Sequence, residues 1–395
     1  MENNQTKYKE TEIGTIPEEW NVLPIYNLAD WVNGLAFKNI NFSINGKPVI
    51  KIAELKHGIT EQTQFTNDIF KDDYFLSKND LLFSWSGSPD TSIDAFWYNL
   101  PNGWLNQHIF KVKPKGSVLV NFLYYIFKAN KQRFIEIARD KQTTGLGHVT
   151  IADLKRFIVA LPPIEQQKQI AEILSSLDDK IELSRRINAN LEAMASALFK
   201  KWFVDIGDEL PKGWRMGTFG EAAENFDSKR IPLSGGERKP GLYPYYGATS
   251  IMDYVENYIF DGTYILLGED GSVAKKDGKP FIQYVSGKIW VNNHAHVLRG
   301  KDGFSTEYLK IFLDQVDIMP FVTGAVQPKL NQANMNRVPM VIPDQNTLDK
   351  FNEMLSALFD MILENESQTK KMEQVRDYLL PRLMNRKIIY GNLRR

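Results

Sequence analysis

Two long segments of the chain carry apolar residues mostly at steps of three and four, which is the period of an amphipathic helix. The first spans residues 164–203, contains no glycine or proline, and follows Pro162-Pro163, where the start of a helix tolerates proline. At 1.5 Å per residue it predicts a helix roughly 60 Å long. The second runs from residue 345 to residue 380, next to Pro381.

Neither apolar stripe is stable in water, so each helix has to cover its stripe with other apolar groups. The stripe positions are Ile170, Ile173, Leu177, Ile181, Ile187, Leu191, Met194 and Leu198 in the first helix and Phe351, Leu355, Leu358, Ile362, Met372, Val375 and Leu379 in the second. Two helices of similar length bury matching stripes most simply against each other, which predicts an antiparallel coiled coil with a pseudo-twofold axis. The alternative is that each helix folds back onto its own globular part.

The rest of the chain predicts small domains of mixed structure. Short apolar or alternating runs of strand length lie between turns rich in Gly, Asn and Asp, at residues 49–52, 109–113, 264–267 and 281–285. Residues 118–137 and 308–316 have the pattern of helices that pack on such a sheet. The predicted class is therefore α+β, with two similar globular parts and two long helices.

The same motifs occur twice in the same order, which indicates an internal repeat. The matched pairs are Pro17-Glu18-Glu19-Trp20 with Pro211-Lys212-Gly213-Trp214, residues 81–88 with 265–272, 104–108 with 290–294, Thr144-Gly145 with Thr323-Gly324, and Leu161-Pro162 with Ile342-Pro343. The spacing drifts in the globular parts and stays fixed through the helices, because loops tolerate insertions more readily than packed helices. The predicted domains are residues 1–162, 163–203, 204–343 and 344–395, alternately globular and helical.

Composition limits the class of protein. Of 395 residues, 43% are hydrophobic and 24% charged, as in soluble globular proteins. The 48 basic and 48 acidic residues give a net charge of 0, which excludes a polycationic coat for DNA or membranes. Cysteine is absent, which excludes disulfide scaffolds, thiolate metal sites and a cysteine nucleophile. We find neither a secretion signal nor a run of membrane-spanning length, so a cytoplasmic protein with no membrane partner is expected.

The sequence contains no familiar catalytic or cofactor motif. Glycine-rich loops for dinucleotides and phosphates, His-Glu-x-x-His, and the Asn-Pro-Pro-aromatic signature of amino methyltransferases are all absent. Pro89-Asp90 could open a nuclease motif, but the next Asp-x-Lys set, Asp153-Leu154-Lys155, lies too far along the chain. These searches point to no catalytic site. An enzyme with an unrecognised site, such as a nuclease, is one alternative.

His294 and His296 would place two rings on one face of a strand and could ligate a metal. The matching positions in the first globular part are His108 and Phe110, so the second ligand is not repeated there. The sequence also offers no cysteine and no evident third ligand. The favoured interpretation is a packed or hydrogen-bonded histidine, with no metal site.

Local basic clusters and one aromatic loop are candidates for nucleic-acid contacts, although neither globular part is strongly basic as a whole. Lys111, Lys113 and Lys115 alternate on a predicted strand. Glycine-rich turns hold Lys229-Arg230, Arg238-Lys239, and Lys275-Lys276 with Lys279. Close to two of these clusters, residues 243–249 form a loop dense in tyrosine and hydroxyl groups. Ordinary solvated loops are the alternative interpretation of each cluster.

This order of motifs resembles the DNA specificity (S) subunit of Type I restriction-modification systems. The resemblance covers nearly the whole chain and rests on Pro-x-x-Trp, Trp-x-Asn-[Gln/Asn]-His, Thr-Gly, and a long helix opened by Leu-Pro-Pro-Ile-Glu-Gln-Gln. The segments that carry it are residues 142–147 with 161–167, and 322–330 with 342–343. The second copy departs from the helix-opening motif, since it reads Pro343-Asp344-Gln345.

The resemblance implies a function and a set of partners. Each globular part is expected to be a target recognition domain that reads one half of a bipartite, asymmetric sequence in double-stranded DNA, while the coiled coil sets the spacer. Two modification subunits supply adenine methylation with S-adenosylmethionine, and restriction subunits supply ATP-driven translocation and cleavage. ATP and Mg are expected on these partners, and neither a catalytic centre nor a cofactor on this chain. A non-catalytic interaction scaffold with a non-DNA ligand is the alternative.

The predicted DNA contacts combine suitable chemistry with loop-like surroundings. Phosphates are met by Lys, Arg and hydroxyl groups, and base edges by Arg, Asn, Gln, Ser and Thr. The residues selected for base reading are Trp85, Ser86, Ser88, Thr144, Tyr245, Tyr246, Thr249 and Lys329. The other predicted DNA-binding residues are Lys111, Lys113, Arg230, Arg238, Lys275 and Lys276.

Overall fold

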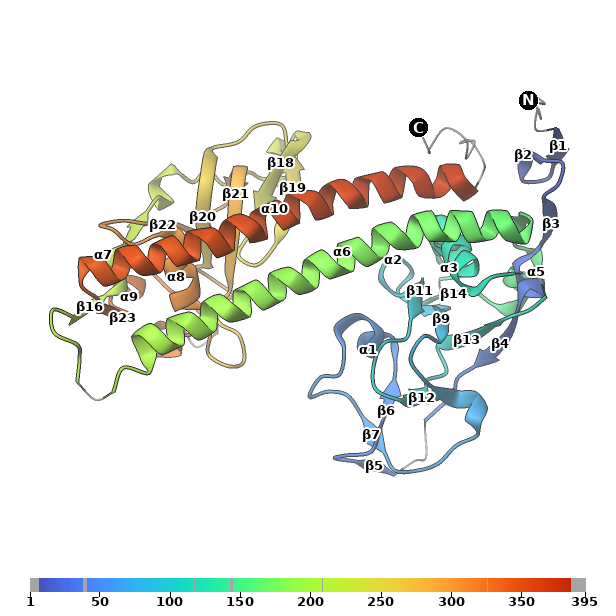
Figure 1. The fold of residues 1–395 in the computed structure, drawn as a ribbon, viewed down its shortest axis with the longest axis horizontal. Helices are drawn as coiled ribbons and strands as arrows, with labels where there is room; N and C mark the ends of the chain where they lie inside the picture. The colour runs from blue at the N-terminus through green and yellow to red at the C-terminus, as the bar shows by residue number, and fades with distance from the viewer. Residues whose placement is uncertain are drawn as a thin grey trace. The chain divides into compact units, whose positions relative to one another are not determined.

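The computed structural model describes residues 7–37, 41–116, 118–142, 145–207, 209–324 and 326–384. The chain divides into two compact units: unit 1 is Met1–Glu182 with Lys370–Arg395, and unit 2 is Leu183–Thr369. Each unit holds sheets and helices of its own, which confirms the predicted α+β class (Figure 1). Within the described ranges, no helix is long and apolar enough to cross a membrane.

The two long helices are α6, Ile164–Phe199, and α10, Gln345–Met384. α6 begins directly after Pro162-Pro163, and a π-helical turn at Lys200–Val204 ends it close to the predicted limit. α10 continues past Pro381, although proline removes an intrahelical hydrogen bond, because the last turn of α10 is buried in the core of unit 1. Each long helix contributes one part to each unit.

In unit 1 the start of α6 packs against the end of α10. Ile170 and Leu174 of α6 share one buried core with Leu383 of α10. Arg376 of α10 donates a hydrogen bond to Asp178 of α6 at 2.9 Å. Residues early in one helix therefore meet residues late in the other, so the pairing is antiparallel.

In unit 2 the end of α6 packs against the start of α10 (Figure 1). Phe199 of α6 contacts Phe351 of α10 edge-on, with ring centroids 6.0 Å apart. Asn188 Nδ2 donates to the Ile362 carbonyl, and Asn188 Oδ1 accepts from Asn365 Nδ2, so a polar pair also fixes the register of the two helices. The predicted antiparallel helix pair is confirmed within each unit.

The buried side of each helix is narrower than the predicted stripes. The same helix halves also pack on the globular part of their unit, since Leu174 shares a core with Phe122, and other core residues join the helices to the sheets. Each helix therefore makes two contacts, one with the other helix as predicted and one with a globular part as in the alternative. Ile187, Met194 and Val375 were assigned to the stripes but are exposed. That assignment was wrong because periodicity identifies a helix face but not the part of it that a neighbour covers.

Unit 1 is built on two larger sheets. Their strand orders are β11-β9-β13-β4 and β5-β7-β6-β12-β8, and three short pairs, β1-β2, β3-β15 and β10-β14, accompany them. The strands are β1 Tyr8–Thr11, β2 Gly14–Pro17, β3 Asn21–Pro24, β4 Ala29–Asn33, β5 Phe42–Ser43, β6 Lys47–Ile50, β7 Phe65–Thr66, β8 Phe75–Leu76, β9 Leu81–Ser84, β10 Ser86–Gly87, β11 Asp94–Trp97, β12 Gly103–Leu105, β13 Ile109–Pro114, β14 Gly147–His148 and β15 Ile158–Leu161.

In the described part of unit 1, five short helices accompany these sheets. They are α1 Ile52–His57, α2 Pro89–Ser92, α3 Val120–Ala129, α4 Lys131–Asp140 and α5 Ile151–Arg156. The single helix predicted at residues 118–137 is divided into α3 and α4 at Asn130. The Asn130 side chain donates to the Ile126 carbonyl, and such a local bond competes with the regular helical pattern. The strand predicted at 49–52 ends at Ile50, where the chain turns into α1.

Unit 2 has one six-stranded sheet of order β17-β22-β20-β21-β18-β19 and the pair β16-β23. The strands are β16 Arg215–Thr218, β17 Ala223–Asn225, β18 Pro240–Tyr246, β19 Ile251–Val255, β20 Phe260–Gly268, β21 Ile282–Val291, β22 Ala295–Gly300 and β23 Pro339–Ile342. The helices are α7 Phe219–Ala222, α8 Thr306–Leu313 and α9 Gln332–Asn336. α8 starts earlier than predicted because Ser305 caps it by accepting from the Tyr308 N–H.

Short 3₁₀ turns complete the connections. They are Ile25–Leu28, Asp72–Tyr74, Asp227–Lys229, Gly235–Glu237 and Met319–Phe321. The strands predicted at 264–267 and 281–285 lie mainly within β20 and β21, which pair antiparallel.

Individual hydrogen bonds recur at equivalent positions in the two copies of the internal repeat. The indole N–H of Trp20 donates to Gln166 at the start of α6, and that of Trp214 donates to Asp344 at the start of α10, both at 2.9 Å. Asp344 also accepts from the N–H and hydroxyl of Thr347 and so caps α10. The second copy departs from the helix-opening motif but keeps the tryptophan contact with a different acceptor.

Phe351 is fully buried against the rings of Phe199, Phe203 and Tyr308. Replacing it with alanine leaves a cavity in this aromatic core, so we expect a loss of about 3 to 5 kcal/mol in the free energy of unfolding. Urea denaturation followed by circular dichroism measures the loss. Met361→Ala at an exposed position of α10 is the control, with an expected change below about 0.5 kcal/mol. Equal losses in both variants would contradict the assigned core.

Candidate nucleic-acid interface

Both units end a central strand at the same kind of junction, after β9 in unit 1 and after β20 in unit 2. The backbone N–H of Trp85 donates to the His108 carbonyl at 3.2 Å. The backbone N–H of Glu269 donates to the His294 carbonyl at 2.9 Å. Trp85 and Glu269 therefore occupy equivalent places in the repeat, and we call these places the unit 1 junction and the unit 2 junction.

The next residue of each junction pairs with a second segment of its unit. Ser86 pairs with His148 in the β10-β14 ladder. Asp270 pairs with Lys329 in an isolated antiparallel bridge. His148 and Lys329 are therefore equivalent as well, although one carries an imidazole ring and the other a flexible ammonium group.

The unit 1 junction is aromatic. The Trp85 ring stacks on Phe110 with centroids 5.4 Å apart, and its indole N–H donates to Asn33 Oδ1 at 2.9 Å. The His148 ring lies 5.9 Å from the Trp85 ring, and its Nδ1 is hydrogen bonded to the Ser86 hydroxyl at 2.9 Å. Ser86 is buried, whereas Trp85 and His148 are half-buried. This junction can offer an apolar ring and an imidazole edge to a ligand.

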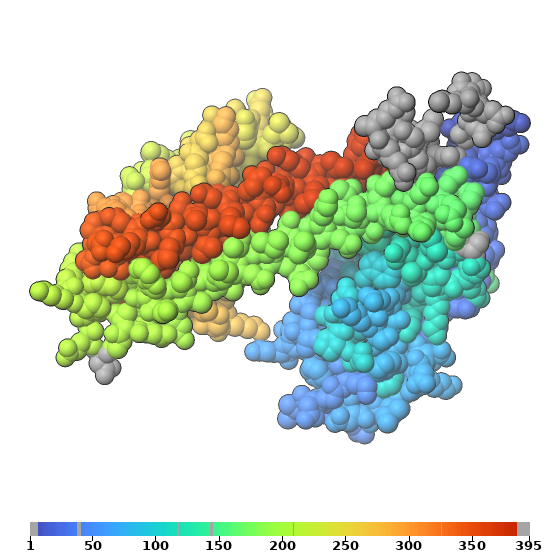
Figure 2. Space-filling model, in the orientation of Figure 1, coloured from blue at the N-terminus to red at the C-terminus, as the bar shows by residue number. Residues whose placement is uncertain are grey.

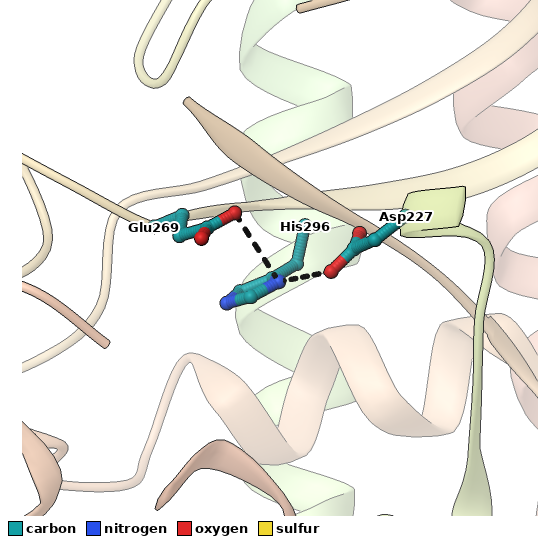
Figure 3. Close-up of side chains that lie close together, drawn as sticks. All are labelled: Asp227, Glu269 and His296. Carbon is teal, nitrogen blue, oxygen red and sulfur yellow. Dashed lines mark hydrogen bonds and ion pairs between the residues drawn. The ribbon is translucent and has the colours of Figure 1, made fainter. Parts of the chain in front are cut away.

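The unit 2 junction is charged. Glu269 Oε2 accepts from Arg230 Nη1 at 2.7 Å, and Glu269 Oε1 lies 3.6 Å from Lys329 Nζ. Figure 3 shows the Nδ1 atom of His296 turned toward the carboxylates of both Asp227 and Glu269. The two carboxylates are mostly buried, whereas the Lys329 side chain is 52% exposed. This junction presents an exposed ammonium group over a buried network of ion pairs.

Asp227, Glu269 and His296 are the one group of side chains in the described ranges that could hold a metal ion, because their ligand atoms lie within 4.8 Å of one another. Arg230 already provides positive charge there, 2.7 Å from Glu269 and 3.5 Å from Asp227. His296 Nε2 donates to the Leu330 carbonyl at 2.7 Å, so both ring nitrogens are hydrogen bonded. The arrangement is that of a packed, hydrogen-bonded histidine within an ion-pair network.

His294 does not share a strand face with His296, as a two-histidine ligand pair would require. β22 begins after His294, which lies in the preceding turn. There its Nδ1 is hydrogen bonded to Asp270 at 2.6 Å, and the side chain is half exposed. The two histidines therefore do not form the pair on one strand face that the sequence suggested.

Two groups at the junctions have shifted pKa values. Burial raises the pKa of Asp227, but the hydrogen bond and charge of His296, with other hydrogen bonds, outweigh it and hold that pKa below its ordinary value. Burial lowers the pKa of His108, and the nearby His148 lowers it further. Asp227 is therefore ionised and His108 neutral at physiological pH.

The other residues selected in unit 1 lie apart from the junction or are engaged. Ser88 is exposed just before α2. Lys111 is mostly buried and pairs with Asp80 at 2.8 Å, so its ammonium group is used inside the unit. Lys113 is half exposed beside an aspartate. Thr144 lies outside the described residues.

Four selected residues lie in or beside β18 of unit 2. Tyr245 is 1% exposed, and its hydroxyl accepts from the Leu233 N–H at 3.0 Å. Arg238 lies over the Tyr245 ring, 4.6 Å from the centroid. Tyr246 is half-buried, and Thr249 is exposed in the turn between β18 and β19. Arg238 and Tyr245 therefore support this loop, while Thr249 faces solvent.

Lys275 and Lys276 lie at the tip of the connection between β20 and β21. The Lys275 N–H donates to the Lys279 carbonyl, which closes the tip. Both lysine side chains are exposed, and across the described parts of the chain neither forms an ion pair. Arg230, by contrast, is mostly buried in the unit 2 junction.

The structure brings Trp85 and Ser86 together at the unit 1 junction and places Lys329 at the unit 2 junction. The sequence reasoning missed His148, which lies beside Trp85, and Glu269, which lies beside Lys329. The sequence did contain a signal for His148. The offset between the two copies of the repeat, which stays fixed through the long helices, already begins at His148 and aligns it with Lys329. A comparable signal existed for Glu269, because the match of residues 81–88 with 265–272 places it opposite the selected Trp85.

Comparison with known proteins identifies the family. A family model described as the Type I restriction modification DNA specificity domain matches residues 17–193 and 211–374. The two matches cover both copies of the repeat. The chain belongs to this family.

Individual members of the family match this chain over its full length or over part of it. The Type I restriction enzyme MjaIX specificity subunit of Methanocaldococcus jannaschii is 25% identical over 444 aligned residues, which cover 99% of this chain and 97% of the relative. A putative type I restriction enzyme specificity subunit of Haemophilus influenzae is 36% identical over 138 residues, or 35% of each chain. The crystal structure of the Type-I restriction-modification system S subunit from M. genitalium has the same fold, with a TM-score of 0.56, 16% identity and coverage of 97% of both chains.

Asp227→Asn tests the ion-pair network of the unit 2 junction. Asp227 accepts from the Val297 N–H and from His296, and loss of these charge-assisted bonds is expected to cost about 2 kcal/mol of unfolding free energy at pH 7. Because the folded-state pKa of Asp227 is lowered, its contribution is complete above its ordinary pKa and is lost as the pH falls through the folded value. The difference in thermal stability between wild type and variant is therefore expected to shrink below about pH 4.

Glu224→Gln is the control for this measurement. Glu224 is exposed on the neighbouring strand β17, so its substitution removes the same charge without breaking the network. We expect its effect on stability to be below about 0.5 kcal/mol. A difference for Asp227→Asn that is equally small, or that grows toward acid pH, would contradict the network.

Proposed function

We propose that this chain is the DNA specificity subunit of a Type I restriction-modification complex, without a catalytic role of its own. Each unit reads one half of a bipartite, asymmetric target in double-stranded DNA, and the α6-α10 pair sets the spacer. The observation that carries this proposal is the repeated junction: the same backbone bonds hold Trp85 in one unit and Glu269 in the other. A domain that is used twice to recognise two different sequences needs a constant backbone that holds different side chains at equivalent places.

The contrast between the junctions supports two different half-sites. A half-buried tryptophan beside an imidazole favours apolar contact and a single hydrogen bond to a base edge. An exposed lysine favours the O6 and N7 acceptors of guanine. Two units with the same side chains would read the same bases, so their divergence supports an asymmetric target.

Exposed lysines support contacts to the DNA backbone. Lys275 and Lys276 project from a loop tip and have no ion pair within the described residues, which leaves their charge for phosphates. The net charge of 0 means that this chain alone supplies little of the neutralisation that tight DNA binding requires. Partner subunits would supply the rest.

Exposed apolar residues on the long helices support the docking of these partners. Leu183, Ile187 and Met194 lie at helical spacing on α6 in unit 2 and are all exposed. In unit 1, Val375 and Tyr378 are exposed on α10. Figure 2 shows the sides of α6 and α10 that face the viewer without other described elements over them. A row of exposed apolar groups indicates a protein interface, and the repeat favours two modification subunits.

The partners would carry the chemistry of the complex. S-adenosylmethionine would bind to the modification subunits, and ATP and Mg to the restriction subunits, because the sequence of this chain has no motif for them. The complex would act on chromosomal DNA in the cytoplasm.

Methylome sequencing tests the proposed function. A host without other adenine methylation would express this chain together with its modification subunit. We expect one methylated bipartite motif with two different halves and a constant spacer, present only when this chain is produced. An assembled complex that leaves no motif would favour a scaffold with another ligand, and Mg-dependent cleavage by the purified chain alone would favour a nuclease.

Equal insertions in both long helices test the role of the helix pair. Asn188 of α6 lies level with Ile362 of α10, so seven residues added after each position keep the seam in register. They lengthen each helix by about 10.5 Å, which corresponds to about three base pairs. We expect methylation at the original spacer to disappear, and either to move to a spacer longer by about three base pairs or to be lost because of the added rotation.

An insertion of the same length elsewhere is the control. Gly235 and Gly236 are exposed, and nothing lies within 4 Å of a side chain at either position. Seven residues placed between them are expected to leave the spacer unchanged. If the helix variant also methylates the original spacer at the wild-type level, the helix pair does not set the distance.

A further inference from the structure

We infer that His148 in unit 1 and Lys329 in unit 2 are equivalent specificity-determining residues, each of which contacts a base edge of its own half-site. The inference rests on the proposed function and names the residues by which each unit distinguishes bases. It departs from the sequence prediction, which selected Lys329 but placed no role on His148.

The equivalence of the two residues is fixed by the backbone around them. The following residue makes the same bond in both units: Val149 N–H donates to the Trp85 carbonyl, and Leu330 N–H to the Glu269 carbonyl, each at 2.8 Å. Both positions are soon followed by a short helix with a side-chain cap, α5 in unit 1 and α9 in unit 2. The backbone therefore places the side chains of His148 and Lys329 at equivalent positions in the two units.

His148 is held on one side and free on the other. The Ser86 hydroxyl fixes Nδ1 at 2.9 Å, and the Trp85 ring lies alongside the imidazole. Within the described residues, no hydrogen bond occupies Nε2, and the side chain is half-buried. Nε2 can donate to a purine N7 or accept from an exocyclic amino group, depending on the tautomer.

Lys329 is anchored through its backbone. Its N–H donates to the Thr323 carbonyl at 2.7 Å, and its carbonyl accepts from the Thr323 N–H at 2.8 Å. The bridge to Asp270 holds the other side of the segment. Nζ lies 3.6 Å from Glu269, which limits the directions of the side chain while half of it remains exposed. An ammonium group placed in this way suits the O6 and N7 acceptors of guanine.

The residue that lies next to each proposed base-contacting side chain also differs between the two units. The imidazole of His148 lies against the indole of Trp85, and the ammonium of Lys329 lies near the carboxylate of Glu269. Trp85 and Glu269 are therefore positioning residues. Each supports the kind of side chain above it, as expected if the two pairs diverged to read different bases.

Other candidates lack one of the two properties that base reading requires, which are anchoring and a free polar group. Lys111, Arg230 and Tyr245 are anchored, but their polar groups are used inside the units. Lys276 and Thr249 are exposed, but no side-chain contact holds either within the described residues. His148 and Lys329 combine both properties.

The test compares His148→Ala and Lys329→Ala in the complex with the modification subunit, read out by methylome sequencing. We expect each variant to relax one base pair in one half-site by about 5- to 150-fold in discrimination, while the other half-site and the spacer stay unchanged. The relaxed half-site is expected to differ between the two variants. His148→Gln replaces the alanine variant if alanine lowers the melting temperature of the complex.

Matched controls carry the same change away from the junctions. His57 is exposed at the end of α1 in unit 1, and Lys350 is exposed on α10 in unit 2. His57→Ala and Lys350→Ala are expected to leave both half-sites at wild-type discrimination.

The outcomes separate this inference from the proposed function. If the wild-type complex produces no bipartite motif, the proposed function is wrong. If the wild type produces one and neither variant changes its bases, the inference alone is wrong. A uniform loss of methylation across all sequences, with the complex intact, would assign the residues to phosphates and would also overturn it.

Discussion

The structure depends on the burial of apolar side chains between α6 and α10. Neither helix can cover these residues alone, and in each unit the paired halves also form one wall of the core. In unit 2 the ring of Phe203, just beyond α6, meets Phe351 of α10 and Tyr308 of the globular part. The helix pair and the globular parts therefore stabilise each other, and changes in the seam affect both.

A second constraint is the network of main-chain hydrogen bonds that the two units share. Main-chain bonds form with almost any side chain, so a frame built from them can remain while the side chains change. The junctions illustrate this: Trp85 and Glu269 make the same backbone contacts but have no chemistry in common. A frame of this kind can hold different side chains at equivalent places without loss of the fold.

Chemistry alone was a weak guide to the candidate site. Lys329 and Trp85 were selected from the sequence, and each keeps part of its side chain exposed at a junction. Lys111, Arg230 and Tyr245 were equally suitable by residue type, yet ion pairs and hydrogen bonds inside the units use their polar groups. The sequence could not separate the two sets, because the partners of a polar group are its neighbours in space.

The sequence by itself determined the two long helices, the α+β class and the repeat, because helical period, strand alternation and motif order are properties of local or ordered residues. Only the tertiary structure decided which helix faces are covered and which polar groups stay free. Asp227 and His296 meet across 69 positions of the chain, and no local pattern records that contact. Burial and hydrogen-bond partners depend on such long-range contacts, so they are settled when the chain packs.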